Sequence, residues 1–252
     1  MRLPRVWPYL LAAALSIAPS PLAQAASPGV SGALSIVPGL GQTVNGDALE
    51  GLGWFVTSAG LFLSGNTYIS QAGYDLWQYN MYDAYRDAGA AGAAKHSVFE
   101  NYIAAFNPLN IIDPIGAPML AVGAVSGGQG SRLSSVPNPL IYRPITYAFV
   151  GLGEEGLFRG FLFPGLSQAF QSKTAGALVS SVLFAYFHIT NGAADIAPPM
   201  ILARTLMGVI FCIQTNLNKN DLRKSIFTHA WWDFLVTRNG GVQGATGIKI
   251  NL

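Results

Sequence analysis

The 252-residue chain contains 51% hydrophobic residues and only 10% charged residues. A soluble globular domain carries about 25% charged residues, so this composition, with a mean hydropathy of +0.37, indicates an integral membrane protein. The formal net charge of +2 is too small, and the basic residues too dispersed, for nucleic-acid binding. The single cysteine, Cys212, excludes an intrachain disulfide and a multi-cysteine zinc site, and its apolar surroundings predict a packing role.

The first 25 residues have the form of a secretory signal peptide. Arg2 and Arg5 precede an apolar run, and the small residues Ala23 and Ala25 precede the predicted cleavage site. We therefore predict a signal peptide over 1–25, and an uncleaved first anchor helix is the alternative. The expected location is an integral position in a membrane, the plasma (inner) membrane if the protein is bacterial.

Residues 26–110 are predicted to form an N-terminal membrane hairpin and an interfacial helix. Pro38 and Gly39 interrupt the first apolar stretch, and a second apolar run follows at 52–63. This part is either a re-entrant hairpin or a broken single crossing. From 74 to 88, aromatic residues are interleaved with charged ones, which is typical of a helix at the membrane surface. A substrate-docking surface is the alternative for that helix.

Residues 111–240 are predicted to form the membrane core, and 241–252 a C-terminal tail. The core segments are shorter or more interrupted than simple anchors, as expected of helices that pack around a polar interior. The fold class is therefore all-α, a multi-span membrane helix bundle with its active site in an intramembrane cavity. Residues 111–125, which Pro114 and Pro118 break, are predicted to form a kinked span. The other apolar core segments are 145–163, 175–189, 196–213 and 226–236.

Glu154, Glu155 and Arg159 place three charges within an otherwise apolar segment. Ionisable residues inside membrane segments are expensive and usually face a cavity or a partner. Glu155 and Arg159 are spaced i,i+4 and are predicted to pair on one helical face. Glu154 is rotated by about 100° from that face, so its carboxylate is left free.

Two further polar positions lie in apolar helices nearer the C-terminus. His188 lies near the end of one helix, and His229 and Asp233 share a face of another at i,i+4. A free carboxylate, two imidazoles and a further polar group suffice to activate water and stabilise an oxyanion.

The three motifs together resemble those of the CAAX-processing and bacteriocin-processing protease family. They are Glu-Glu-x-x-x-Arg at 154–159, Phe-x-x-x-His at 184–188 and His-x-x-x-Asp at 229–233. That family includes the Ras-converting CAAX endopeptidases, which are intramembrane glutamate-dependent proteases. The resemblance covers about residues 140–240.

The resemblance implies a role for each motif residue. Glu154 is expected to activate the hydrolytic water with help from His188. His229 is expected to stabilise the tetrahedral oxyanion, and Glu155 and Arg159 to organise the site.

Asp233 departs from part of the family pattern. Position 233 is Asn in the prenyl-protein branch and Asn or Asp in the wider family, and it is expected to assist at the oxyanion. An ionised Asp cannot donate a hydrogen bond as Asn can. Asp233 is therefore either protonated or orients His229, which moves the chain away from the prenyl-protein branch.

The main hypothesis is an intramembrane endopeptidase that hydrolyses a peptide bond in a membrane-associated protein or peptide by glutamate-activated water. A non-catalytic membrane scaffold or immunity-type binding protein is the alternative, and a proton-coupled transporter is less favoured because no repeat is visible. The expected partners are a peptide or membrane-protein substrate and the lipid bilayer, with no nucleic acid. No cofactor is expected. Zinc is the alternative, but the sequence lacks the His-Glu-x-x-His spacing.

The other notable polar and aromatic residues have structural interpretations. His96 is expected at the surface, and Arg204 either to counter an acidic group or to extend toward the membrane interface. Trp231 and Trp232 are expected to pack or to anchor at the interface.

Overall fold

The computed structural model describes residues 26–126, 142–191 and 197–237, so the predicted signal peptide and C-terminal tail lie outside the described residues. The described residues fold into helices, as the predicted all-α class requires. In chain order these are α2 (Pro28–Leu34), α3 (Leu40–Val44), α4 (Ala48–Phe62), α5 (Thr67–Asp87), α6 (Val98–Ala104), the 3₁₀ helix η1 (Pro108–Ile111), α7 (Gly116–Ser126), α8 (Tyr142–Glu155), the π-helix η2 (Gly156–Leu162), α9 (Phe163–Ala169), α10 (Lys173–Phe187), the 3₁₀ helix η3 (His188–Asn191), α11 (Pro198–Leu217) and α12 (Arg223–Val236).

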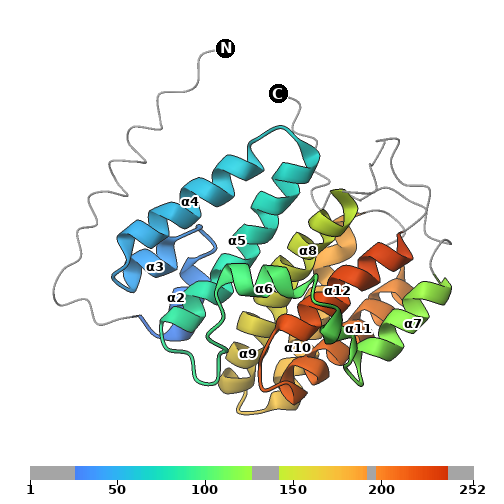
Figure 1. The fold of residues 1–252 in the computed structure, drawn as a ribbon. Coiled ribbons are helices and arrows are strands. Elements are labelled where there is room, and N and C mark those ends of the chain that lie inside the picture. The colour runs from blue at the N-terminus through green and yellow to red at the C-terminus, as the bar shows by residue number, and fades with distance from the viewer. Residues whose placement is uncertain (1–25, 127–141, 192–196, 238–252) are drawn as a thin grey trace.

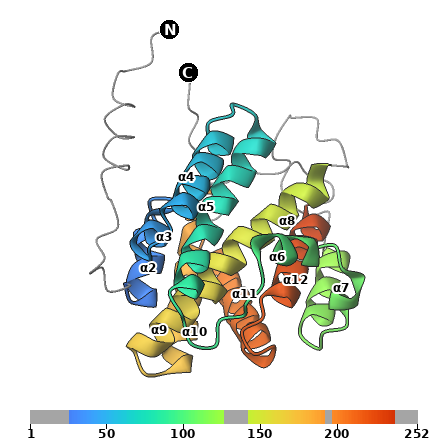
Figure 2. The same cartoon turned by 60° about the vertical axis from the view of Figure 1, so that its left-hand side comes forward.

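Helix α8 lies at the centre of the bundle, with α5 packed along one side and α12 along the other (Figure 1). Helix α4 covers the outer side of α5, and α7 covers the outer side of α12. Helices α10 and α11 pack against each other and complete the C-terminal half (Figure 2). Side chains from α5, α8 and α12 can therefore meet.

A stripe of glycines on α8 and η2 lets the backbone of α5 approach closely. A Cβ at any of these positions would overlap an α5 residue, so only hydrogen fits there without a shift. An added Cβ would lie 2.5 Å from the backbone oxygen of Asp75 at Gly153, 2.8 Å from Tyr79 Cδ2 at Gly156, and 2.5 Å from Tyr82 Cδ2 at Gly160. Small residues that allow such close packing are typical of helix pairs in membranes. The stripe fixes the register of α5 against α8.

A different glycine of α8 faces α12. A Cβ on Gly151 would lie 2.8 Å from the backbone oxygen of Ile226 and 3.4 Å from Cβ of Ala230. Both flanking helices therefore contact α8 through positions that carry no side chain.

Buried polar contacts attach the N-terminal helices to α5. Gly39 adopts φ +80°, which suits glycine, and makes the break predicted at the Pro-Gly pair. Its amide donates to Asn80 Oδ1 at 2.8 Å, and Asp83 Oδ2 accepts from Gln42 Nε2 at 3.1 Å and Trp54 Nε1 at 3.0 Å. The helix predicted at 74–88 thus begins earlier, at Thr67, and buries one face in the bundle. Its depth relative to a membrane stays a prediction.

The apolar segment at 111–125 does not form one kinked helix. The 3₁₀ helix η1 ends at Ile111, and Asp113 Oδ1 accepts hydrogen bonds from the amides of Ile115 at 3.0 Å and Gly116 at 2.7 Å. Helix α7 begins only at Gly116, because Asp113 caps the amides at its start and Pro114 has no amide to continue a helix from η1.

The other predicted core segments are helical. Of the described helices, α11 is long and apolar enough to cross a membrane, and α7 and α10 are shorter apolar helices. Large apolar side chains remain exposed on α10 and α11, among them Leu178, Leu183, Leu202 and Leu206. An exposed apolar surface of this kind suits contact with lipid.

Candidate active site

Glu154 and Glu155 are the last residues of α8, directly before the π-helix η2. Both are buried, with 7% of Glu154 and none of Glu155 exposed. π-helical turns are rare and frequent at functional sites. The charged stretch is therefore an interior feature in an irregular part of the helix.

Glu155 is held from two sides. Its Oε1 lies 3.0 Å from Arg159 Nη1, so the predicted i,i+4 ion pair is confirmed. The same oxygen lies 2.8 Å from His229 Nδ1, which donates to it from α12. Glu155 thus joins α8 to α12 and fixes the orientation of the His229 ring.

Aromatic rings surround the buried Arg159 guanidinium. Its Cζ lies 4.3 Å from the ring centroid of Phe184 and 4.8 Å from that of Phe211. Phe211 also stacks on the His229 ring, with centroids 5.1 Å apart. Phe184 was part of a predicted motif, but the contribution of Phe211 from α11 was not predicted. An aromatic residue in an apolar helix carries no signal that distinguishes it from core.

Glu154 faces two imidazoles that come from different helices. Its Oε2 lies 3.5 Å from His188 Nε2 and 3.7 Å from His229 Nε2. His188 caps the C-terminus of α10, and its Nδ1 lies 2.8 Å from the carbonyl oxygen of Phe184. Since a carbonyl only accepts, His188 Nδ1 carries a proton.

Asp233 completes the predicted group. Its Oδ2 lies 3.6 Å from His229 Nε2, one helical turn away on α12. The structure therefore brings Glu154, His188, His229 and Asp233 together. Their catalytic roles stay predictions.

Helix α5 adds residues to this site that sequence reasoning missed. Asp75 is fully buried and accepts a hydrogen bond from Gln71 Nε2 at 2.9 Å. The neighbouring Tyr74 stacks on Phe187, with ring centroids 6.1 Å apart. The available signal was an acidic residue on the face of α5 that also carries Gln71, but the surrounding charges favoured an exposed helix.

Metal binding has a different candidate position. In the described ranges, one group of acidic, His or Cys side chains has ligand atoms within 4.8 Å of one another, namely Glu50, Asp83 and Asp87. Arg86 pairs with Asp83 at 2.5 Å and with Asp87 at 2.7 Å, so two of these three carboxylates already share one guanidinium. Metal-free activation of water at the site around Glu154 stays a prediction.

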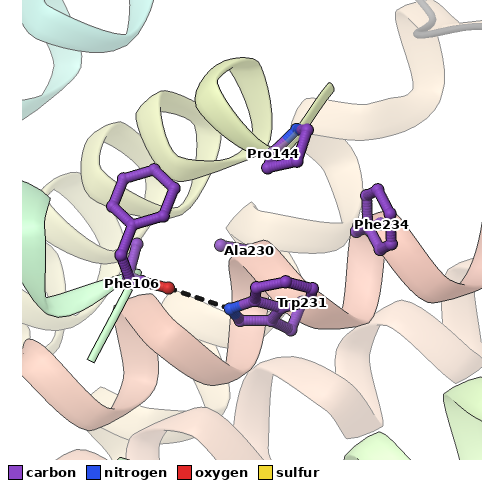
Figure 3. A pocket seen from close by; sticks show the side chains of 6 residues that line it. Phe106, Pro144, Ala230, Trp231 and Phe234 are labelled. Carbon is purple, nitrogen blue, oxygen red and sulfur yellow. Dashed lines mark hydrogen bonds between the residues drawn. The ribbon is translucent and has the colours of Figure 1, made fainter. Parts of the chain in front are cut away.

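The face of α12 beside the site is apolar. Figure 3 shows a small pocket lined by Phe106, Pro144, Ala230, Trp231 and Phe234. Trp231 Nε1 donates to the carbonyl oxygen of Ala105 at 2.9 Å, and Trp232 packs against Gly123. Both tryptophans pack in the bundle, as predicted.

His96, Cys212 and Arg204 lie outside the group around Glu154. His96 is partly buried, with its Nε2 3.6 Å from Asp221 Oδ2, so it joins two loops rather than standing free at the surface. Cys212 is buried, in agreement with a packing role. The charge of Arg204 acts on Asp233, which fits the interpretation that it counters an acidic group.

Comparison with known families locates this site. Residues 136–235 match the family model described as Type II CAAX prenyl endopeptidase Rce1-like. This stretch, called the Rce1-like segment below, is similar to that family. The match confirms the resemblance stated from the motifs. No curated protein and no solved structure matches the chain.

The Rce1-like segment, residues 136–235, contains the whole predicted site. It runs from before α8 almost to the end of α12, and it includes Glu154, His188, His229 and Asp233. The Rce1-like family is membrane-embedded and generally proteolytic. Asp75 on α5 lies outside this segment.

Proposed function

We propose that this protein is an intramembrane endopeptidase that hydrolyses a peptide bond in a membrane-associated protein or peptide. The observation that carries the proposal is the position of Glu154 Oε2, which faces the Nε2 atoms of His188 and His229 within a buried, largely apolar site. The Rce1-like match over the same residues supports the same reaction class.

Glu154 and His188 form the water-activating pair. Because Nδ1 of His188 donates to a backbone carbonyl, Nε2 of the neutral ring is an acceptor, and it faces an acceptor oxygen of Glu154. A molecule with two donors, such as water, satisfies both. Glu154 then removes one proton as the water oxygen attacks the peptide carbonyl carbon.

His229 stabilises the oxyanion that this attack creates. Its Nδ1 proton is fixed by Glu155, and Arg159 holds Glu155 in turn. The protonated Nε2 donates toward the developing negative charge, in a buried site where such a hydrogen bond is worth more than in water. The C–N bond breaks next, and the leaving amine takes the proton from Glu154.

Substitution of Glu154 by Gln tests the proposal. Gln keeps the shape but removes the base, so we expect peptidase activity in detergent or membranes to fall by about 10³-fold or more. The matched control is Glu100→Gln, because Gln can still accept the hydrogen bond in the Ser97 capping box. Glu154→Gln should also accumulate one defined uncleaved species. Full activity in a folded Glu154→Gln protein would reject the proposal.

The metal-free form of the mechanism has its own measurement. We expect a strong zinc chelator to leave activity unchanged. Loss of activity that added Zn²⁺ restores would show that the two histidines and Glu154 act as ligands instead.

A further inference from the structure

The buried carboxyl of Asp75 has one unused oxygen. No part of its side chain is exposed, and Oδ1 accepts from the Gln71 amide. Among the described residues, Oδ2 has no hydrogen-bond partner. A buried polar atom without a partner is unfavourable unless another molecule contacts it.

The register of α5 brings this carboxyl to the active site. A Cβ on Gly153 would meet the Asp75 backbone at 2.5 Å, so Asp75 lies against the residue that precedes Glu154. The charge of Glu154 from α8 acts on the Asp75 carboxyl, as do those of His229 and Asp233 from α12. On its own helix, the neighbouring ionisable group is the Tyr74 hydroxyl.

These surroundings favour the protonated form of Asp75. Its hydrogen-bond donor is a neutral amide, and Glu154 and Asp233 are of like charge. A buried carboxyl in such a place is more stable neutral than ionised. Because Oδ1 accepts from Gln71, the proton belongs on Oδ2. Asp75 is then a hydrogen-bond donor.

In the proposed reaction the oxyanion lacks a second hydrogen-bond donor. An ionised Asp233 accepts hydrogen bonds only, so of the predicted oxyanion pair only His229 can donate. We propose that the Asp75 O–H of α5 donates the second hydrogen bond to the tetrahedral oxyanion. This rests on the proposed endopeptidase function. The hydrogen bond strengthens as charge develops, and Asp75 keeps its proton throughout.

Two substitutions at the same position test the role. Asn keeps an N–H donor on the Oδ2 side, whereas Leu removes every donor. We expect Asp75→Asn to retain kcat within about tenfold, and Asp75→Leu to lose about 10²–10³-fold, the usual effect of one oxyanion donor.

The matched control is Gln78→Leu. Gln78 lies one turn further along α5 and is also buried, and its side-chain atoms have no hydrogen-bond partner among the described residues. Its replacement should leave kcat unchanged. Equal inactivity of folded Asp75→Asn and Asp75→Leu, or full activity of Asp75→Leu, would overturn the proposal.

Infrared spectroscopy tests the protonated acid without any activity assay. The wild type at neutral pH should show the carbonyl stretch of a buried carboxylic acid that Asp75→Asn lacks and Asp113→Asn retains. Absence of that band in the wild type overturns the proposal, even if Asp75→Leu fails to fold. If the band is present but no peptidase activity is found, the proposed function fails and the buried acid stands.

Discussion

Helices α5 and α12 flank α8 in similar ways, but only on α12 could the site residues be predicted from the sequence. His229 and Asp233 share one face of α12 at a spacing that a single helix explains. The His229 side chain contacts Glu154 and Glu155 at the C-terminal end of α8. Asp75 reaches the same region because its helix packs closely against the stripe of glycines on α8 and η2. Site residues that share one helix can be predicted from their sequence spacing. A site residue on a separate helix depends on how the two helices pack, which the local sequence pattern does not show.

The comparison is tested most directly by combining a substitution on α5 with one on α12. If Asp75 supplies the donor that Asp233 cannot, then Asp233→Asn should restore it from the other side. We expect Asp75→Leu to lower kcat by about 10²–10³-fold in the wild type but by only about tenfold in the Asp233→Asn background. The measurement is a double-mutant cycle on kcat. Strict additivity would show that the two side chains act independently.

A substitution at Gly153 disturbs the packing of α8 against α5 but not against α12. In Gly153→Ala, the new Cβ would overlap the Asp75 backbone, so α5 must shift. Overpacking of this kind costs about 1–3 kcal/mol, and a displacement of about 1 Å in a site can lower the rate about 10²-fold. Activity and the thermal midpoint should both fall. The control is Gly165→Ala in α9, where an added Cβ has open space. An unchanged rate in Gly153→Ala would mean that the register does not position the site.

Much of the fold followed from hydrophobicity and from helix-breaking residues. The break at Gly39 and the helices at the four later core segments were predicted, because these depend on local backbone preferences and apolar runs. The π-helix after Glu155 was not, since nothing in the composition of the segment distinguishes its hydrogen bonding from that of an α-helix. The segment at 111–125 was also interpreted wrongly, because the side-chain cap made by Asp113 outweighs the apolar run.

In the candidate site too, contacts within one helix could be predicted and contacts between helices could not. The Glu155–Arg159 pair required only an i,i+4 spacing, and the structure contains it at 3.0 Å. The bond from His229 to Glu155 spans two helices, and only the family resemblance pointed to their proximity. Phe211 and Asp75 belong to no motif, so their places depend on tertiary packing alone.

A second junction joins Asp113, which precedes the Rce1-like segment, to that segment; it contacts no predicted site residue and should affect stability only. Buried Asp113 accepts hydrogen bonds from Gln214 Nε2 of α11 at 3.0 Å and from Nδ2 of Asn218, the C-cap of α11, at 3.2 Å. Burial alone would raise the pKa of Asp113, but the Gly116 amide and these two side chains outweigh it and lower that pKa. The ionised form therefore stabilises the fold above the unfolded-state pKa of about 3.9, and this contribution is lost as the pH falls through the folded pKa.

We expect Asp113→Asn to lower the free energy of unfolding by about 1–3 kcal/mol at neutral pH and to change kcat less than about twofold. The difference from wild type should shrink below about pH 4, because protonation removes the same charge from the wild-type protein. Thermal unfolding across this pH range measures the effect. Asp47→Asn is the matched control, since Asn caps α4 as well as Asp does. A loss of kcat in Asp113→Asn comparable to that in Asp75→Leu would mean that packing of the N-terminal part, rather than a specific donor on α5, sustains the reaction.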